Sequence, residues 1–529
     1  MKNRKSTKRA LLGSVMAMVL CLAMLVGATF AWFTDTASTG VNKIQAGKLD
    51  VALEMKEGDS WVSAEGKTLN WVKAAAGEQV LWEPGCTYTL PELRVVNNGN
   101  LALKYKIQIT GIQGDAKLNE VIDWTINDAA IDLTEGHLTA GQQGDAFTIK
   151  GHMKETAGND YQNLTIDGIG ITVYATQDTV EYDSFNNTYD ANAQYPAMPY
   201  VTSHEALNTN LTLADIPTNE ATGKHDPVEV ALGNTEAGDI AYSEHSSGYT
   251  GKGVMLGSTK LNSYAAAPAK AGEYTFVFKN GTINSAATGY SSIDNLKDTS
   301  VYMLVPGNSD VVFENMTFNG VVSFDIQMYT SPWSYLHSIT FKNCTFNGIV
   351  VGSCPAEKAI FDGCTFNNYT NAIYANNSNP IWWRAGTGYW GTGADESVHS
   401  LKEFTFVNNK VTSTRPVKIE RIGWNCTAGI TILDNTFDIS KQAGDSETKN
   451  MAINIGQRDN TSKFILTDDG NTISAGTASL YTAALGSGSN QYVAVSGSKV
   501  LDRNGNDKVI TAMVWKTTTG ETFEMKTIN

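Results

Sequence analysis

The sequence predicts an all-β protein in which an N-terminal jelly-roll-like β-sandwich is followed by a right-handed parallel β-helix with a short C-terminal β cap. Short runs that alternate apolar and polar residues fill the first part of the chain. One pattern of an apolar residue, a turn and a second apolar residue recurs seven times in the second part. The composition, with 48 Gly, only 12 Pro and frequent Asn, Thr and Ser, favours ordered β structure, and 529 residues imply two or three domains.

The N-terminus has the features of an export signal. Five basic residues are followed by an uncharged run over 10–34; they are Lys2, Arg4, Lys5, Lys8 and Arg9. Small residues cluster near Ala31, so residues 1–31 are expected to be a signal peptide that is removed there. The uncharged run is also long enough to span a bilayer, which leaves an uncleaved anchor as the alternative.

Net charge and cysteine content argue against some classes of partner and some kinds of site. Removal of the leader leaves 34 Lys and Arg against 54 Asp and Glu, a net charge of about −20, which argues against nucleic acid. Membrane contact is expected only through an uncleaved signal segment. The five cysteines beyond the leader form no dense disulfide framework and no CxxC pair; they are Cys86, Cys344, Cys354, Cys364 and Cys426.

Residues 32–200 are expected to form the sandwich. Runs at 49–53, 105–109 and 169–173 alternate in polarity, so each would bury one face. Turns are predicted at 83–85 (Glu-Pro-Gly) and 97–100 (Asn-Asn-Gly-Asn).

Several motifs of this region carry a family resemblance. They are Ala31-Trp32-Phe33-Thr34-Asp35, Gly47-Lys48-Leu49-Asp50-Val51, Pro84-Gly85 leading into 93–101 (Leu-Arg-Val-Val-Asn-Asn-Gly-Asn-Leu), and the stretches 175–177, 183–185 and 189–190. Together they resemble the TasA/camelysin family of biofilm fibre proteins, which a dedicated signal peptidase exports. The resemblance covers about a third of the chain. It implies a jelly-roll sandwich that assembles into extracellular fibres by lending an N-terminal strand to the next subunit.

The donated strand would be 33–51. Such an exchange is physically reasonable, because the edge of a sheet presents N–H and C=O groups that an extended segment of another chain can pair with. The alternative is that 33–51 is the first strand of its own domain.

Camelysin-like proteins have been grouped with metalloproteases, but no metal site is expected here. No two of the seven histidines are three or four residues apart, and HExxH is absent; they are His137, His152, His204, His225, His245, His337 and His399. Zinc hydrolysis needs about three convergent ligands and a base. We therefore expect no protease activity, no metal and no cofactor.

The seven repeats predict coils of a β-helix within 254–490. They lie at 278–283, 313–318, 341–346, 361–366, 406–411, 432–437 and 467–473, with gaps of varied length. Their apolar residues would stack at the strand spacing of about 4.8 Å. Asn suits a left-handed turn and can form a hydrogen-bonded ladder. Cys344 and Cys364 take the same place in successive coils, as stacked buried thiols or, alternatively, a disulfide. In architecture this region resembles the pectate-lyase-like superfamily, which has many functions.

Two further segments flank the coils. Residues 201–253, rich in Asp, Glu, Gly and Ser, are expected to be a linker and N-terminal cap. Residues 491–529 are expected to be a C-terminal hairpin cap, with strands at 499–501 and 509–511 around 504–506 (Asn-Gly-Asn). The segment 502–507 (Asp-Arg-Asn-Gly-Asn-Asp) starts like a calcium loop, but Asp507 stands where the required Gly belongs and Met513 stands where the bidentate Glu belongs, so we interpret it as a turn. The segment 183–190 is expected to be a polar loop, with calcium as the alternative.

The long gap at 376–399 is expected to be a loop that binds carbohydrate. Its candidate binding residues are Trp382, Trp383, Arg384, Tyr389 and Trp390, which Trp333, Tyr335 and Trp424 could extend. Indole rings pack on the apolar faces of sugars, and Arg fixes hydroxyls or a uronate. The alternative is that these rings pack the loop against its coil.

The strand at 415–421 suggests weak catalytic candidates. Alternation would put Val417 and Ile419 inward and Lys418 and Glu420 outward. A polysaccharide lyase or glycosidase on this face would use Asp325, Glu420 and Arg421. A solvated, salt-bridged face is the alternative interpretation.

Together these features predict an exported structural or adhesion protein of the extracellular matrix or cell surface, without enzymatic activity. Self-association into fibres and a polysaccharide or cell-wall glycan are its expected partners. The alternative function is a polysaccharide lyase or glycoside hydrolase on the β-helix.

Overall fold

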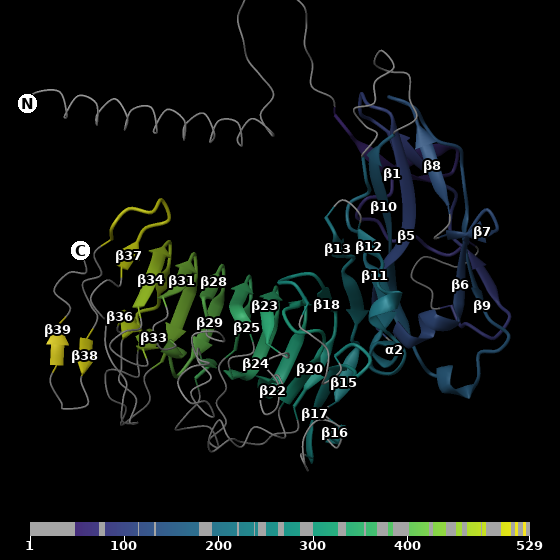
Figure 1. Ribbon diagram of the computed structural model, residues 1–529. Coiled ribbons are helices and arrows are strands. Elements are labelled where there is room, and N and C mark those ends of the chain that lie inside the picture. Colours follow the sequence, from purple (N-terminus) through teal and green to yellow (C-terminus); the bar gives the residue numbers. More distant parts are fainter. Residues whose placement is uncertain are drawn as a thin grey trace, which may run out of the picture.

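The computed structural model describes most of the chain from Lys48 onward, with gaps. The described residues are 48–72, 80–114, 116–131, 134–178, 193–219, 222–236, 238–241, 250–262, 269–285, 300–325, 335–353, 356–367, 379–384, 401–422, 427–440, 451–457, 463–477, 479–482, 499–508, 514–516 and 522–524. The predicted signal peptide, most of the predicted donor segment, the polar loop 183–190, Trp333, Tyr389, Trp390 and Trp424 lie outside them. Nearly all described elements are strands, which confirms the all-β class (Figure 1).

The N-terminal region is built from three small antiparallel sheets. The first has the order β2 (Ser60–Ser63), β1 (Val51–Glu57), β4 (Leu93–Asn97); the second has the order β10 (Ile166–Gln177), β5 (Leu103–Gly114), β8 (Glu135–Leu138). The third has the order β3 (Thr87–Thr89), β9 (Ile149–Met153), β6 (Ile122–Ile126), β7 (Ala129–Ala130). One core joins all three sheets, and its buried residues include Met55, Val95, Ile107 and Ile149. The predicted strands at 49–53, 105–109 and 169–173 fall within β1, β5 and β10 apart from two residues before β1.

The second region is a parallel β-helix with three faces (Figure 1). We call its ten-stranded sheet the first face; it consists of β11 (Tyr200–Ser203), β14 (Val228–Ala231), β18 (Thr275–Lys279), β21 (Asp310–Glu314), β23 (Leu336–Lys342), β25 (Ala356–Asp362), β28 (Glu403–Val407), β31 (Thr427–Leu433), β34 (Lys463–Asp469) and β37 (Lys499–Leu501).

Fifteen further strands form one branched sheet. Its first branch, the second face, contains β15 (Asn234–Glu236), β19 (Thr282–Asn284), the starts of β22 (Thr317–Asp325) and β24 (Thr345–Ser353), β26 (Thr365–Phe366), β29 (Lys410–Ser413), β32 (Thr436–Ile439) and β35 (Thr472–Ile473). The other branch, the third face, contains β17 (Thr250–Gly257), β20 (Ser300–Leu304), the ends of β22 and β24, β27 (Ile381–Arg384), β30 (Val417–Ile422), β33 (Met451–Gln457) and β36 (Ser479–Thr482). The short β16 (Gly238–Ala241) joins β17 in antiparallel fashion.

A two-residue turn joins the first face to the second in all seven predicted repeats. Its first residue has a positive φ in each case: Asn280 (53°), Asn315 (54°), Asn343 (52°), Gly363 (67°), Asn408 (57°), Asp434 (55°) and Gly470 (68°). Asn, Asp and Gly are the residues that best tolerate this left-handed conformation. The predicted turn chemistry is therefore confirmed.

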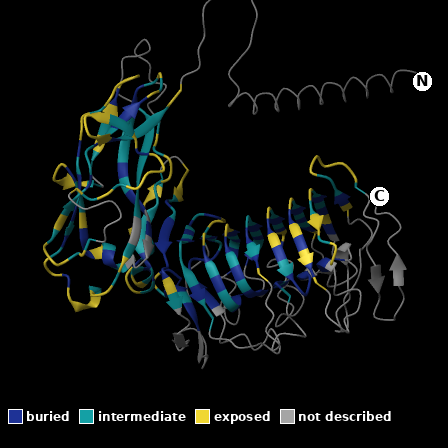
Figure 2. Ribbon diagram, turned by 180° about the vertical axis from the view of Figure 1, so that it is seen from behind, coloured by how far each residue is buried: buried dark blue, intermediate teal, exposed yellow. Residues whose placement is uncertain are grey.

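Aromatic side chains stack from coil to coil in the core. Ring centroids of Phe313, Phe341 and Phe361 lie 5.3 and 4.7 Å apart along the first face. Those of Phe318 and Phe346 lie 4.9 Å apart on the second face. Figure 2 shows the resulting buried positions along the whole coil stack. Each coil thus buries its apolar residues against its neighbours, as the repeat predicts.

The parallel stacking begins earlier than the predicted boundary at residue 254. Strand β11 starts at Tyr200 and pairs in parallel with β14, so the segment predicted as linker and cap contains coils of the β-helix. The cap itself is the helix α2 (His204–Thr209), whose Leu207 is fully buried in the core. The hydroxyl of Ser203 caps α2 by accepting a hydrogen bond from the Ala206 N–H at 3.0 Å.

At the other end, β37 continues the first face, and the chain then turns back. The Lys508 N–H donates to the Val500 carbonyl at 2.9 Å, so this turn covers the free edge of β37. The predicted turn around Gly505 (φ 82°) is present. A separate hairpin follows, formed by β38 (Val514–Lys516) and β39 (Thr522–Glu524). The predicted strand at 509–511 lies outside the described residues.

The sandwich packs directly on the first coils. Ile109 and Ile112 of β5 share a buried cluster with Ala231 of β14. At the same junction the Gln108 Nε2 donates to the Pro199 carbonyl at 2.7 Å, and Lys117 pairs with Glu205 at 2.7 Å. The sandwich projects from the N-terminal end of the β-helix, which has the shape of a rod, and the two regions together form an L (Figure 1).

Candidate functional site on the third face

The predicted aromatic loop begins with a strand. Residues Ile381–Arg384 form β27, which pairs in parallel with β24 on one side and β30 on the other. This part of the predicted insertion is therefore a coil of the β-helix. The prediction of a loop at these four residues is wrong.

Trp383 belongs to the core. Its side chain is fully buried and meets Phe341 and Phe361 edge to face, with centroids 6.4 and 5.5 Å away. Gly352 makes room for the indole, because a Cβ there would lie 2.3 Å from the ring. The prediction that Trp383 stacks on a sugar is therefore wrong, and the alternative of inward packing holds for it. Tyr335 is also buried, at 4 % exposure, and does not extend a surface platform.

Trp382 lies on the opposite side of β27 and is half-buried. It stands in register with Lys418 of β30, whose Nζ lies 4.6 Å from the centroid of the indole ring. A cation at this distance is attracted to the ring face and competes with a sugar for it. Carbohydrate binding by Trp382 stays a prediction.

The register collects the other candidates into one column of the third face. Arg384 is in register with Glu420, and Ser353 with Arg384. Asp325 stands one residue after Phe324, which is in register with Gly352. The side chains of Asp325, Arg384, Glu420 and Arg421 lie outside the described ones. The backbone thus brings together residues that are far apart in sequence.

The alternation predicted for the strand at 415–421 is present where side chains are described. Val417 and Ile419 are fully buried in the core, whereas Lys418 faces outward over Trp382. Arg415 lies two residues before β30, so the observed strand starts later than predicted. It is buried, and its Nη1 donates to the Thr414 carbonyl at 2.8 Å.

Long connections border the third face and not the corner between the other two faces. The segments 285–299, 367–380 and 440–450 lead from the second face into the third, and 385–402 and 483–498 lead from the third back to the first. Variable connections of this kind on a regular scaffold are the common location of binding residues. The third face is therefore the candidate site.

Two of the motifs that carry the family resemblance contact each other through their described residues, 48–51 and 93–101, and we call this contact the joint. The Asn98 N–H donates to the Asp50 carbonyl at 2.7 Å, and the Asn100 N–H to the Lys48 carbonyl at 3.0 Å. Gly99 permits this approach, because a Cβ there would lie 2.2 Å from the Lys48 carbonyl oxygen. The buried Asn97 donates from Nδ2 to the Leu101 carbonyl at 2.7 Å. These residues fix where the chain enters the sandwich.

The histidines that the structure describes contact other protein groups. His137 Nδ1 lies 2.7 Å from Asp178, His337 Nδ1 lies 2.8 Å from Asp310, and His152 Nδ1 lies 2.8 Å from the Thr87 hydroxyl. Burial lowers the pKa of His204, whose Nε2 contacts the Met255 carbonyl. Within the part of the chain that the structure describes, no three His, Cys, Asp or Glu residues converge as a metal site.

Cys344 and Cys364 are free, buried and adjacent in the stack, as predicted. Their thiols donate to the carbonyls of Phe313 and Phe341, each at 3.3 Å. Burial raises the pKa of Cys364 above its ordinary value. The Cys364 thiol is therefore protonated, which makes it a poor nucleophile.

An aromatic cluster in the sandwich has no counterpart in the sequence predictions. Trp82 lies 5.4 Å from Trp71 and 5.0 Å from Tyr88, centroid to centroid, and Trp124 lies 6.2 Å from Trp71. Trp82 and Trp124 pack over Gly151, where a Cβ would be 2.7 and 3.0 Å from them. The cluster closes the space between two parts of the core. Its members come from separate segments, so no local pattern indicates it.

The segment 502–507 near the C-terminus is a turn, as predicted. The Asp502 carboxylate accepts hydrogen bonds from the backbone N–H groups of Asn504 and Asn506 at 2.9 and 2.8 Å. The Asn506 side chain also donates to this carboxylate, at 3.0 Å, and this bond together with the backbone bonds lowers the pKa of Asp502.

Comparisons with known proteins bear on the N-terminus. No curated protein and no solved structure matches the chain. Among the described residues, no helix is long and apolar enough to cross a bilayer. The family described as camelysin metallo-endopeptidase matches residues 6–58, which confirms the predicted TasA/camelysin resemblance for the N-terminal region.

Proposed function

We propose that this chain is an exported structural protein of the extracellular matrix or cell surface, in which the sandwich supports a rigid β-helical rod. The shared core of Ile109, Ile112 and Ala231 carries the proposal, because it joins the two regions into one body. A shared apolar core restricts relative domain motion, which suits a load-bearing or displaying element. The match of residues 6–58 to a family with exported matrix proteins also supports it.

Self-association through the N-terminal arm is the finer part of this proposal. The last residues of the predicted donor segment, from Lys48 to Val51, pair with the subunit's own strand β4 and the turn after it. The residues before Lys48 would be the ones exchanged, and the joint at Gly99 would orient them.

Deletion of residues 32–43 tests this self-association. Light scattering of the exported protein should show loss of the large assemblies formed by the unaltered chain, while the far-ultraviolet circular dichroism stays the same. Unchanged assembly in the deletion variant would contradict the exchange. A protein that is absent from the matrix and surface fractions of the producing cells would contradict the wider proposal.

A second candidate is a polysaccharide lyase or glycoside hydrolase on the third face. The register that aligns Arg384 with Glu420, in the same column as Asp325 three strands earlier, favours it over other enzymes. Incubation with pectin, alginate and glycosaminoglycans should then release unsaturated or reducing ends. Steady release that Glu420→Gln or Arg421→Ala abolishes would replace the structural proposal with this one.

A further inference from the structure

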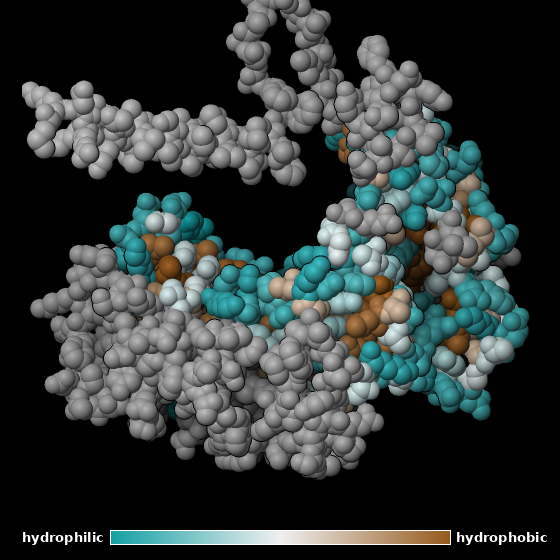
Figure 3. Space-filling view, in the orientation of Figure 1, coloured by the Kyte–Doolittle hydropathy of each residue, from teal (hydrophilic) through white to brown (hydrophobic). Residues whose placement is uncertain are grey.

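The turn that follows β37 lies across the C-terminal end of the first face, and we call its residues 502–508 the strap. Its backbone pairs with β37. The Lys508 N–H donates to the Val500 carbonyl at 2.9 Å, and Leu501 forms an antiparallel bridge with Asp507. Most residues of the strap are exposed, and it gives the end of the rod a hydrophilic surface (Figure 3). The strap thus occupies the edge on which a further strand would pair.

The inward residues of the first face end on a charge. In six successive coils one inward position is apolar and fully buried; its residues are Phe278, Phe313, Phe341, Phe361, Phe406 and Ile432. In the next coil the residue in register is Asp468, which is only 5 % exposed. A buried carboxylate is costly unless it is paired and hydrogen-bonded. The chain therefore has to supply a partner at this end of the core.

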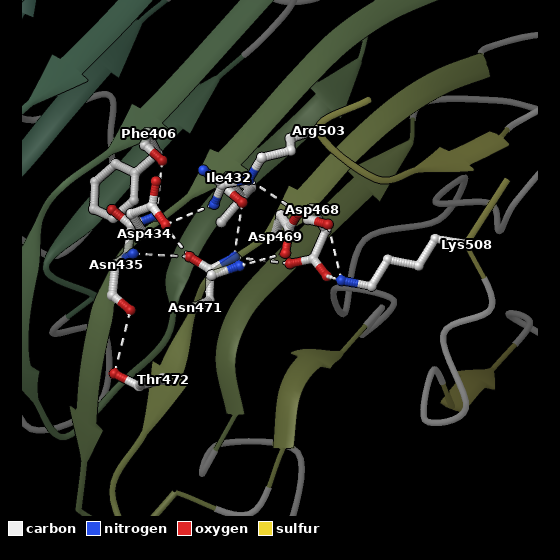
Figure 4. A network of polar contacts seen from close by, with 11 residues as sticks. Phe406, Ile432, Asp434, Asn435, Asp468, Asp469, Asn471, Thr472, Arg503 and Lys508 are labelled. Carbon is white, nitrogen blue, oxygen red and sulfur yellow. Dashed lines mark hydrogen bonds and ion pairs between the residues drawn. The ribbon is translucent and has the colours of Figure 1, made fainter. Parts of the chain in front are cut away.

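That partner is Lys508, the last residue of the strap. Its Nζ lies 2.7 Å from the Asp468 carboxylate and donates to the Asp468 carbonyl at 2.8 Å (Figure 4). Strand β37 pairs with β34 only over 465–467, so this carbonyl lies beyond the last strand pairing. Lys508 thus serves both the buried carboxylate and the part of the β34 edge that β37 does not reach.

Arg503 anchors the other end of the strap. Its guanidinium contacts Asp434 and Asp469 at 2.7 and 3.0 Å. The strap is therefore held at both ends by cations that bind carboxylates of the two preceding coils.

The two ends of the rod are closed in different ways. At the N-terminal end, α2 packs Leu207 into the core, and the sandwich segment η1 (Ala116–Val121) lies against α2 and β11. At the C-terminal end, among the described residues, β37 pairs with β34 on one side and with the strap on the other. An uncovered edge strand pairs readily with another chain. The edge of β37 is the same in every copy, and antiparallel pairing joins two equal strands by two-fold symmetry. A second copy is therefore the partner that this edge fits.

We propose that the strap is an autoinhibitory contact, which keeps two copies of this chain from pairing through the edges of β37. When Lys508 leaves Asp468, the strap opens, and β37 pairs in antiparallel fashion with β37 of a second copy. Only the C-terminal ends meet in this way, because the N-terminal end is covered, so the product is a dimer and not a fibre. This contact does not depend on the N-terminal exchange proposed above.

Loss of one charge tests the strap. In the full, exported chain, Lys508→Met keeps the backbone N–H and the aliphatic stem but leaves the buried Asp468 without its cation. Hydrogen exchange of the strap amides should be about tenfold faster or more, and sedimentation should show a dimer. Lys402→Met is the matched control, since Lys402 also pairs with a carboxylate of the first face, Glu357 at 2.6 Å, but away from the end of the rod. The control should change neither measurement.

A disulfide across the strap provides the second test. Leu501 and Asp507 lie opposite each other in the antiparallel bridge, so Leu501→Cys combined with Asp507→Cys should lock the strap on oxidation. In the Lys508→Met background the locked chain should be a monomer, and reduction should restore the dimer. Faster exchange without a dimer, a dimer that the disulfide does not prevent, or no change in either measurement overturns the proposal. The dimer should also persist after deletion of residues 32–43, and its loss there would overturn the proposal, because the N-terminal segment has no part in this contact.

Discussion

The corner between the first and second faces differs from the corners that border the third face. In the seven sequence repeats this corner is a two-residue turn, and the positive φ of its first residue favours Asn, Asp or Gly there. The others vary from short turns to segments such as 385–402. Where the backbone has no freedom, the fold dictates residue type. Where the connection length varies, the fold leaves residues available for function.

The largest effect is expected in the buried asparagine ladder next to the corner between the first and second faces, which we call the constant corner (Figure 4). Asn435 is 1 % exposed. Its Oδ1 accepts two hydrogen bonds from Asn409, one from the backbone N–H at 2.8 Å and one from the side-chain Nδ2 at 3.1 Å. Its own Nδ2 donates to the carbonyl of Phe406 and to Asn471. Asn435→Ala should cost about 3 kcal/mol, because it leaves buried groups of several partners unpaired.

Asn319 provides the matched control for Asn435. It belongs to a half-exposed ladder on the second face, with a bond to Asn284 of 2.7 Å. Asn319→Ala should cost about 1 kcal/mol, since water replaces the lost partner. Chemical denaturation of both variants measures the two costs. Equal costs would show that burial of the constant corner does not set its residue type.

The sequence was most informative at this corner. The recurring Asn predicts both the left-handed turn and the ladder, because one residue type meets two local requirements. Cys344 and Cys364 followed from the same spacing. The start of the β-helix was misjudged because the coils of β11 and β14 precede the first recognisable repeat.

The third face could be predicted only in part. The sequence does not indicate whether Trp382 or Trp383 faces inward. The segment 376–399 is rich in Gly and therefore suggests a loop, although it contains the strand β27. The decisive feature is the space above Gly352, one coil before Trp383 in the stack, and no local pattern reveals it. The column of Arg384 and Glu420 likewise depends on register between strands that are distant in sequence.

A smaller effect is expected at the turn residue itself. Asn343 has a φ of 52°, and a left-handed residue with a Cβ costs about 1 to 2 kcal/mol unless it is Asn or Asp. Asn343→Ala should therefore destabilise by about 1 kcal/mol, whereas Asn343→Gly should change stability little. Thermal unfolding of the two variants measures the difference. An Ala variant as stable as the Gly variant would show that the turn has another backbone conformation.

The smallest effect concerns the outer rim of the corner, where Arg503 bridges two successive coils. Its guanidinium lies 2.7 Å from Asp434 and 3.0 Å from Asp469, and all three side chains are substantially exposed (Figure 4). The hydrogen bond from Arg503 lowers the pKa of Asp469. A carboxylate with a lowered pKa stabilises the fold above its unfolded pKa of about 3.9, and this contribution is lost as pH falls through the folded value. Arg503→Ala should thus be slightly less stable than the unaltered chain at pH 7. The difference should shrink in high salt, because exposed charges are screened, and should vanish at the acidic end of a pH series of denaturation midpoints. A difference that persists in acid would mean that Arg503 acts through packing of its aliphatic stem and not through charge.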